Sequence, residues 1–182
     1  MLKRLAASVC AAAMLGAVPT TAQAATPQPS EWNYADETYL LPAGATCKDK
    51  VFEKAKYAYR VTEYQDGRVF VEYKDWSTTT FINARNHKTY TIPAGGDILI
   101  TPSGETTEHI KLQGDNYILG KGVKGLLYTK GTVSYTVVNV GDPERETTRN
   151  LNLSRAKKVI EVCAKLGSTP VQGSNPPSEP IG

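Results

Sequence analysis

The chain has 182 residues, with 21 Lys and Arg, 18 Asp and Glu, and a formal net charge of +3 at pH 7. A chain of this length suits one domain with short tails rather than several domains. A charge this close to neutral does not supply the basic face that nucleic acids require, so we expect no nucleic-acid partner.

The N-terminus predicts an export signal. Two basic residues precede an apolar run over 5–18, and Ala22 and Ala24 follow in the small-x-small pattern that signal peptidase cleaves. The run is shorter than the roughly 20 apolar residues that span a membrane. A signal peptide over 1–24, cleaved between Ala24 and Ala25, is therefore favoured over a membrane anchor. The mature protein would be soluble and extracellular, and would meet a membrane only during export.

The cysteines predict one disulfide. Cys10 lies in the apolar run and would leave with the signal peptide, so Cys47 and Cys163 are the mature pair. In an oxidising compartment an isolated pair is typical of a bridge, and two buried free thiols are the alternative. The bridge would close a loop worth about 4–5 kcal/mol in chain-entropy models. Two cysteines so far apart form no CxxC redox centre, which favours a structural role.

The mature N-terminus, residues 25–42, is expected to be an irregular lead-in. Pro27, Pro29 and Pro42 interrupt regular structure there, while aromatic residues such as Trp32 could pack on a core.

From residue 43 onward the dominant signal has a period of two, as in half-buried strands. The clearest case is a hairpin, with strands over 55–62 and 69–74 joined by the turn Asp66-Gly67. Further strands are expected over 77–83, 89–92, 98–101, 106–112, 117–119, 126–129 and 132–140, with turns at 84–87, 114–116 and 130–131. About eight or nine short strands predict an all-β, mainly antiparallel domain over 43–167, a single β-sandwich or barrel.

The end of this domain differs in period. Ser154 can cap a helix whose apolar positions are three or four residues apart, and Gly167 can end it. Those apolar positions are Ala156, Val159, Ile160, Cys163 and Leu166. The disulfide would then pin this short C-terminal helix to the strand that follows Cys47. The remaining residues, 168–182, are rich in Pro, Gly and Ser, and we expect a disordered tail.

The order of several short motifs resembles a known group. A cysteine before the first strand is followed by the DGR turn, then "WSTTTFIN", "GLLYTKGTVSYTV" and the closing "VIEVCAKLG". Over residues 46–167 this order resembles small secreted β-rich proteins of high-GC Gram-positive bacteria. The resemblance implies an exported bacterial all-β protein and transfers no catalytic residue. The architecture is also similar to that of lipocalins, although Ser30-Glu31 precede Trp32 where lipocalins have G-x-W.

Common catalytic and metal sites find little support. A Ser-His-Asp triad would have to use His87 or His109, both expected to be exposed, and no G-x-S-x-G motif is present. The loop from Asp142 to Glu146 is the closest to a calcium site, but it contains Pro143 and lacks D-x-D-x-D-G spacing. We therefore predict no cofactor and no metal, and name no catalytic residue.

The remaining candidates are carboxylates and aromatic rings. Glu53, Glu63 and Glu72 lie on expected strands, and many of the ten tyrosines do so too, where they pack or line a groove. We favour a non-enzymatic protein that binds an extracellular ligand, which is a small molecule, a glycan or a protein. The alternatives are a surface structural or interaction protein without a ligand pocket, and an enzyme whose carboxylates meet only in the fold.

Overall fold

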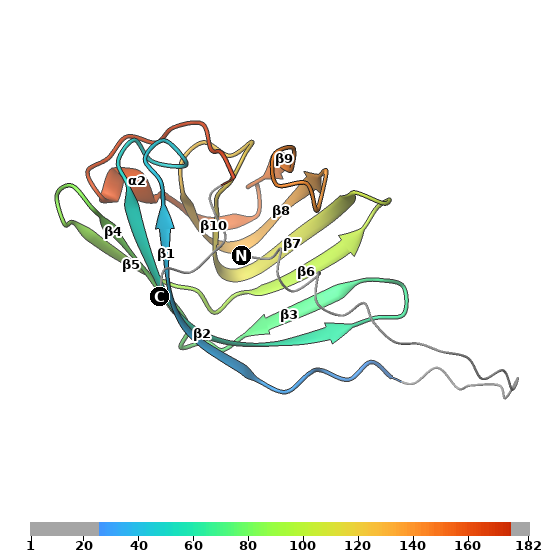
Figure 1. Ribbon diagram of the computed structural model, residues 1–182. Coiled ribbons are helices and arrows are strands. Elements are labelled where there is room, and N and C mark those ends of the chain that lie inside the picture. The colour runs from blue at the N-terminus through green and yellow to red at the C-terminus, as the bar shows by residue number, and fades with distance from the viewer. Residues whose placement is uncertain (1–25, 176–182) are drawn as a thin grey trace, which may run out of the picture.

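The computed structural model describes residues 26–175, and within them ten antiparallel strands form one open sheet (Figure 1). The strands are β1 (Asn33–Leu41), β2 (Val51–Glu63), β3 (Val69–Tyr73), β4 (Thr78–Asn83), β5 (Thr89–Pro93), β6 (Asp97–Pro102), β7 (Thr107–Ile118), β8 (Leu127–Val138), β9 (Thr147–Asn152) and β10 (Ala156–Glu161), and the helix α2 covers Val162–Lys165. The predicted all-β class is confirmed. The expected signal peptide and its Ala24–Ala25 cleavage site lie outside the described residues. No helix within 26–175 is both long and apolar enough to cross a membrane.

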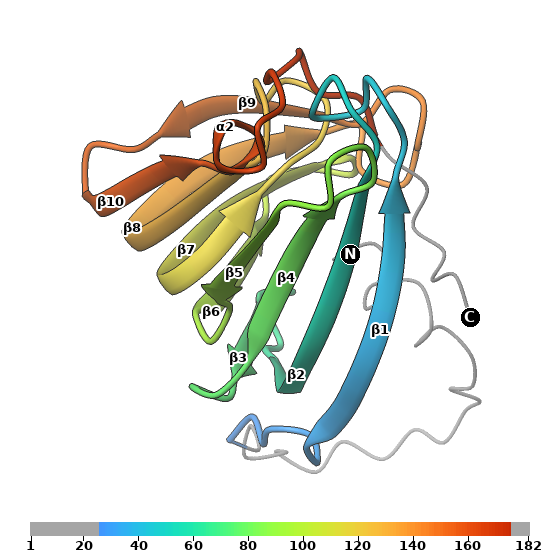
Figure 2. The same ribbon diagram turned by 90° about the vertical axis from the view of Figure 1, so that its left-hand side faces the viewer.

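Two long strand pairs organise the sheet. β1 and β2 pair over nine positions, and the other edge of β2 is shared by β3 and β4. β7 and β8 pair over twelve positions, and the other edge of β8 is shared by β9 and β10. β6 joins the two halves by pairing with β3 and β7. The sheet curves strongly, so that one face is concave (Figure 2).

The core lies on the concave face as two apolar clusters. The first gathers around α2 and the disulfide, and the second lies over β3, β6, β7 and β8. Alternation along β2 decides which side chains face inward, because successive residues point to opposite faces. Val51 and Ala55 are buried on the concave side, while Lys54 and Lys56 are exposed on the convex side.

The predicted hairpin around Asp66-Gly67 is confirmed as β2 and β3. The predicted turns at 114–116 and 130–131 are wrong, because β7 and β8 continue through these two segments without interruption. Gly114 and Gly131 stand opposite each other in the β7–β8 register. Both adopt positive φ, 86° and 109°. These glycines therefore bend two paired strands instead of ending them.

The predicted irregular lead-in over 25–42 is wrong for residues 33–41, which form β1. The prolines lie outside this segment, so every residue in it can join the ladder. Its nine backbone positions pair with β2, whose edge would otherwise leave N–H and C=O groups unpaired.

The predicted helix from Ser154 to Leu166 is mostly wrong. Residues 156–161 form β10 along the edge of β8, and the register shifts at a bulge between Ala156 and Lys158. A bulge inserts an extra residue, which breaks strict alternation and imitates helical spacing. Val159, expected to be buried, is 43% exposed. Only the last turn is helical, and it begins where Glu161 accepts hydrogen bonds from the amides of Cys163 and Ala164.

The predicted disordered tail over 168–182 is wrong for residues 168–175, which we call the C-terminal clasp. On one side its backbone bonds to the β1–β2 loop, through Lys48 N to Thr169 O (2.8 Å) and Val171 N to Thr46 O (3.0 Å). On the other side it bonds to the β7–β8 loop, with Gly173 N donating to Val123 O at 2.7 Å. The clasp therefore joins the loops of the two long strand pairs. Residues 176–182 lie outside the described part.

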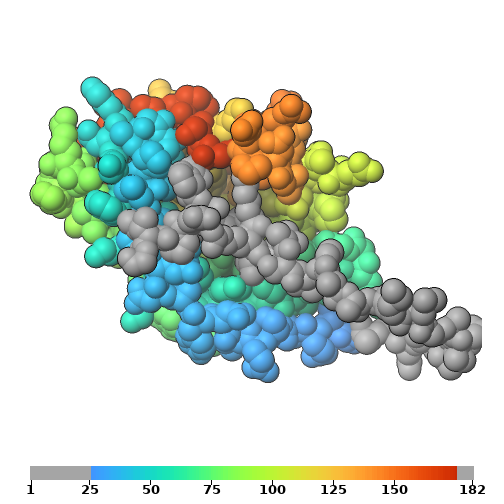
Figure 3. Space-filling view, in the orientation of Figure 1, coloured from blue at the N-terminus to red at the C-terminus, as the bar shows by residue number. Residues whose placement is uncertain are grey.

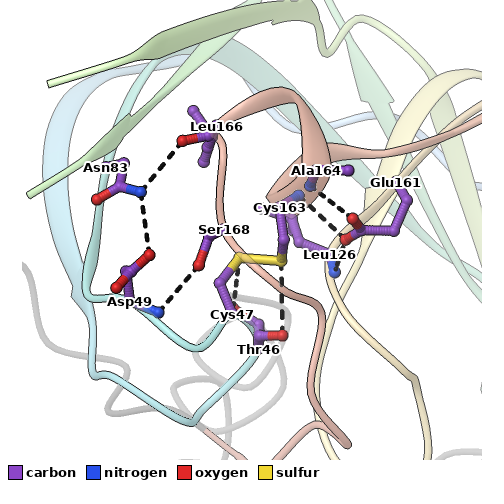
Figure 4. The surroundings of a disulfide bond; sticks show 10 residues. All are labelled: Thr46, Cys47, Asp49, Asn83, Leu126, Glu161, Cys163, Ala164, Leu166 and Ser168. Carbon is purple, nitrogen blue, oxygen red and sulfur yellow. Dashed lines mark hydrogen bonds between the residues drawn. A yellow bond between two sulfur atoms is a disulfide. The ribbon is translucent and has the colours of Figure 1, made fainter. Parts of the chain in front are cut away.

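The Cys47–Cys163 disulfide is confirmed, with 5.5 Å between the Cα atoms. Both cysteines are fully buried. Figure 4 shows the bridge between the β1–β2 loop and α2, beside the start of the clasp. The Asp49 amide donates to Ser168 Oγ at 3.0 Å, and Asn83 donates to the Leu166 carbonyl at 3.1 Å. The covalent link is thus reinforced by hydrogen bonds from β4 and from the β1–β2 loop.

The bend of the sheet yields the first prediction. A Cβ on Gly96 would lie 2.5 Å from Gln113 O and 2.7 Å from Asp115 O, both backbone atoms of β7. Gly96→Ala should therefore lower the free energy of unfolding by more than about 2 kcal/mol, measured by urea denaturation. The control is Gly141→Ala, where φ is positive but no atom lies within 4 Å, and where we expect a loss of about 1 kcal/mol. Equal losses in the two variants would contradict the close packing at this bend.

Candidate functional site

Tyrosine and glutamate side chains meet on the concave face between the two apolar clusters. We call this group the tyrosine–glutamate seam. Its members are Glu37 and Tyr39 of β1, Glu53, Tyr57 and Tyr59 of β2, Tyr73 of β3 and Tyr117 of β7. The odd-numbered members on β1 and β2 face the same way because the register pairs Tyr39 with Glu53 and Glu37 with Ala55. The seam thus occupies positions that an ordinary core would fill with apolar residues.

Glu37 is the first hydrogen-bonding centre of the seam. Its Oε2 accepts the hydroxyl of Tyr57 at 2.7 Å and also the hydroxyl of Tyr39. Burial, and then these bonds to a carboxylate, raise the pKa of both phenols well above the usual value. Both tyrosines therefore remain protonated donors throughout the physiological range.

Glu53 is the second centre and the most buried carboxylate of the seam, with 2% of the residue exposed. Its Oε1 accepts the hydroxyl of Tyr117 at 2.6 Å. Burial raises the pKa of Glu53 from 4.5 to about 6, opposed by the Tyr117 bond and assisted by the charge of Glu37. Within residues 26–175, the ion pairs of the structure include neither Glu37 nor Glu53.

The two carboxylates are close neighbours across β1 and β2. In the register they are diagonal partners, whose Cα atoms lie roughly 7–8 Å apart in an antiparallel pair. This places two acidic groups and their phenol donors on one patch of the concave face. Such a pair can accept hydrogen bonds from a bound molecule, or hold and release a proton at Glu53.

The aromatic part of the seam is a trio of tyrosines beside the carboxylates. The ring centroids of Tyr57, Tyr59 and Tyr73 lie 5.9–6.0 Å from one another, with the rings tilted. All three are half-buried rather than fully enclosed. Burial raises the pKa of Tyr73 to about 12. The trio therefore presents a ring surface with polar edges next to Glu37.

Only one of the three carboxylates named from the sequence belongs to the seam. Glu53 does, whereas Glu63 is exposed at the end of β2. Glu72 forms a two-point ion pair with Arg60, at 2.7 and 3.0 Å. Sequence reasoning missed Glu37 because it lay in the segment predicted to be irregular. The alternation of Glu37, Tyr39 and Leu41 was the signal that could have revealed a strand there.

The remaining candidates stay apart from the seam. His87 is exposed in the β4–β5 turn. His109 is exposed on β7, where its Nδ1 lies 3.1 Å from Thr136 Oγ1. The Asp142 carboxylate accepts the backbone amides of Glu144 and Arg145 and so closes its own turn. Within residues 26–175 no three His, Cys, Asp or Glu side chains are grouped to hold a metal ion.

Comparisons with known proteins add no relative: no protein-family model, curated protein or solved structure matches this chain.

The raised pKa of Glu53 gives the second prediction. The folded protein holds this proton at pH values where the unfolded chain has released it, so the contribution to stability is present below pH 4.5 and is lost as the pH rises through about 6. From about one pH unit below 4.5 to about one unit above 6, the free energy of unfolding should fall by about 2 kcal/mol more in the wild type than in Glu53→Gln. Urea denaturation at several pH values measures this difference. Parallel pH profiles for the two proteins would contradict the burial of an ionisable Glu53.

Proposed function

We propose that the protein is exported and binds a small extracellular ligand on its concave face, at the tyrosine–glutamate seam. The proposal rests on Glu53, a buried carboxylate that accepts a hydrogen bond from the Tyr117 phenol and, within residues 26–175, has no Lys or Arg ion-pair partner. Burying such a group costs free energy, so its place in the fold calls for a role beyond packing. The disulfide supports an oxidising compartment, where such bridges persist.

The chemistry of the seam indicates the class of ligand. Ionised carboxylates accept hydrogen bonds and donate none, so they favour a molecule with amino or hydroxyl groups. The faces of Tyr57, Tyr59 and Tyr73 supply an apolar and π surface that also attracts a cation. A small amine or a polyhydroxylated molecule meets both requirements.

The same carboxylates support a second candidate, an acid–base enzyme. A catalytic acid needs a pKa near the working pH, and Glu53 has a pKa of about 6 with a second carboxylate beside it. A screen of glycoside, ester and peptide substrates at acidic and neutral pH separates this candidate from simple binding. Turnover that is lost in Glu53→Gln, while binding is retained, would assign the site to catalysis.

Native mass spectrometry of the protein from its own culture medium tests the binding function. We expect the wild type to carry additional non-protein mass. The doubly substituted Glu53→Gln, Tyr57→Phe protein should lose that mass because it lacks the charge and one phenol donor. The control is Glu63→Gln, an exposed carboxylate on the same strand, which should retain it. Wild-type protein without added mass, or equal added mass in all three proteins, would contradict binding at the seam and would favour a structural surface protein.

A further inference from the structure

The convex side of the sheet carries a second aromatic group, unrelated to the seam. Tyr34 is 71% exposed and Trp76 is 45% exposed, and with Val159 they are the large hydrophobic residues exposed within the described part. The rings of Tyr34 and Trp76 are nearly parallel, 13° apart, with centroids separated by 6.4 Å. Trp32 precedes β1 and is half-buried. We call Trp32, Tyr34 and Trp76 the convex aromatic strip, because Trp32 lies two residues before Tyr34 and the ammonium group of Lys74, two residues before Trp76, lies over the Trp32 ring.

The sheet itself holds this strip in place. Tyr34 pairs with Ala58 of β2, so it projects from the convex face, opposite to Glu53 and Tyr57. On the other edge of β2, the turn that carries Trp76 is tied down by the bond from Lys74 N to Ala58 O, at 2.9 Å. Ala58 is fully buried despite its position on the convex side. The first described residues, blue in Figure 3, lie on the molecular surface. The backbone that carries Tyr34 is therefore held by the pairing of β1 with β2, and the turn that carries Trp76 is held by the hydrogen bond to Ala58 on the other edge of β2.

The charges around the strip are balanced. Arg60 lies 4.9 Å from the Trp32 ring centroid and Lys74 Nζ lies 3.9 Å from it, both in cation–π geometry. Arg60 is also paired with Glu72 at 2.7 Å, and Asp75 is exposed beside Trp76. Glu31 precedes Trp32, and Asp36 stands opposite Lys56 on the same face as Tyr34. The cations near the rings are thus matched by acidic groups, so the strip has no positive field that would select a polyanion such as nucleic acid. The patch therefore suits an uncharged partner.

We propose that the convex aromatic strip binds a neutral polysaccharide outside the cell. The rings of Tyr34 and Trp76 stack on each other and remain exposed, so their outer faces and edges offer an apolar surface for the C–H face of a sugar ring. Exposed aromatic rings that gather in one patch are typical of interaction sites. The neighbouring Lys74 and Asp75 supply donors and acceptors for sugar hydroxyls. The strip is separate from the seam, so the protein would hold a polymer on one face and a small ligand on the other.

Affinity electrophoresis in gels containing neutral polysaccharides tests this assignment, with hydroxyethyl cellulose, mannan and arabinogalactan as soluble probes and chitin as an insoluble pull-down. The wild type should be retarded by at least one neutral probe. Tyr34→Ala and Trp76→Ala should each weaken that binding about 10-fold, because each removes one of the two exposed rings that contact the sugar. Tyr34→Phe should retain it because the ring remains. Val159→Ala is the matched control, since it removes an exposed apolar side chain elsewhere.

Two further measurements separate polysaccharide binding at the strip from ligand binding at the seam and from self-association. Glu53→Gln should bind the polysaccharide as the wild type does, so failure of the seam as a ligand site leaves the strip unaffected. Sedimentation of the wild type and of the Tyr34→Ala, Trp76→Ala double variant reports self-association. No retardation of the wild type by any neutral probe, undiminished binding in both alanine variants, or a wild-type dimer that the double variant loses would overturn the proposal. The last result would assign the strip to a second copy of the chain.

Discussion

The structure depends on how an open sheet holds together its two halves, one built on the β1–β2 pair and the other on the β7–β8 pair. Among the strands within residues 26–175, the backbone ladders of the two halves meet at β3 and β6, over the three register pairs from Val69 to Val71. Besides the Tyr117–Glu53 hydrogen bond from β7 to β2, the Cys47–Cys163 disulfide and the C-terminal clasp supply a further connection, at the opposite end of the long strand pairs. A covalent bond across 116 residues restricts the unfolded chain, and the clasp adds backbone hydrogen bonds to both loops in the folded state. Together they fix the width of the concave face without closing a barrel.

This arrangement explains why a polar seam can exist inside a small protein. The two apolar clusters are organised separately, one around the disulfide and α2, the other over β6, β7 and β8. The region between them does not have to supply the main hydrophobic stabilisation. Glu37 and Glu53 can therefore be retained there, and within residues 26–175 their carboxylates accept phenol hydroxyls and form no ion pair with a lysine or arginine. Burying Glu53 costs folding free energy, and Glu53 lies on the face where we propose that a ligand binds.

Local chemistry made part of this fold predictable. The Asp66-Gly67 turn and the alternation on either side of it depend on neighbouring residues, and the β2–β3 hairpin followed from them. Gly114 and Gly131 carried the same turn signal. They stand opposite each other in the β7–β8 ladder and bend it, and this can be seen only from the strand pairing. The helical spacing near Val159 came from a bulge, and β1 was hidden among prolines that lie outside it. Glu53 could be named as a candidate, but its nearness to Glu37 and Tyr117 depends on register and curvature, which sequence spacing does not contain.

Hydrogen exchange measured by mass spectrometry, comparing the oxidised protein with the Cys47→Ala, Cys163→Ala variant, tests the central claim most directly. If the disulfide and clasp hold the two halves at a fixed width, loss of the bridge should speed exchange at 45–48, 123–125 and 168–175. The β2–β3 and β7–β8 pairs should keep most of their protection, because their ladders are independent of the bridge. Unchanged exchange in those three segments, or a uniform loss of protection across the whole sheet, would contradict this account.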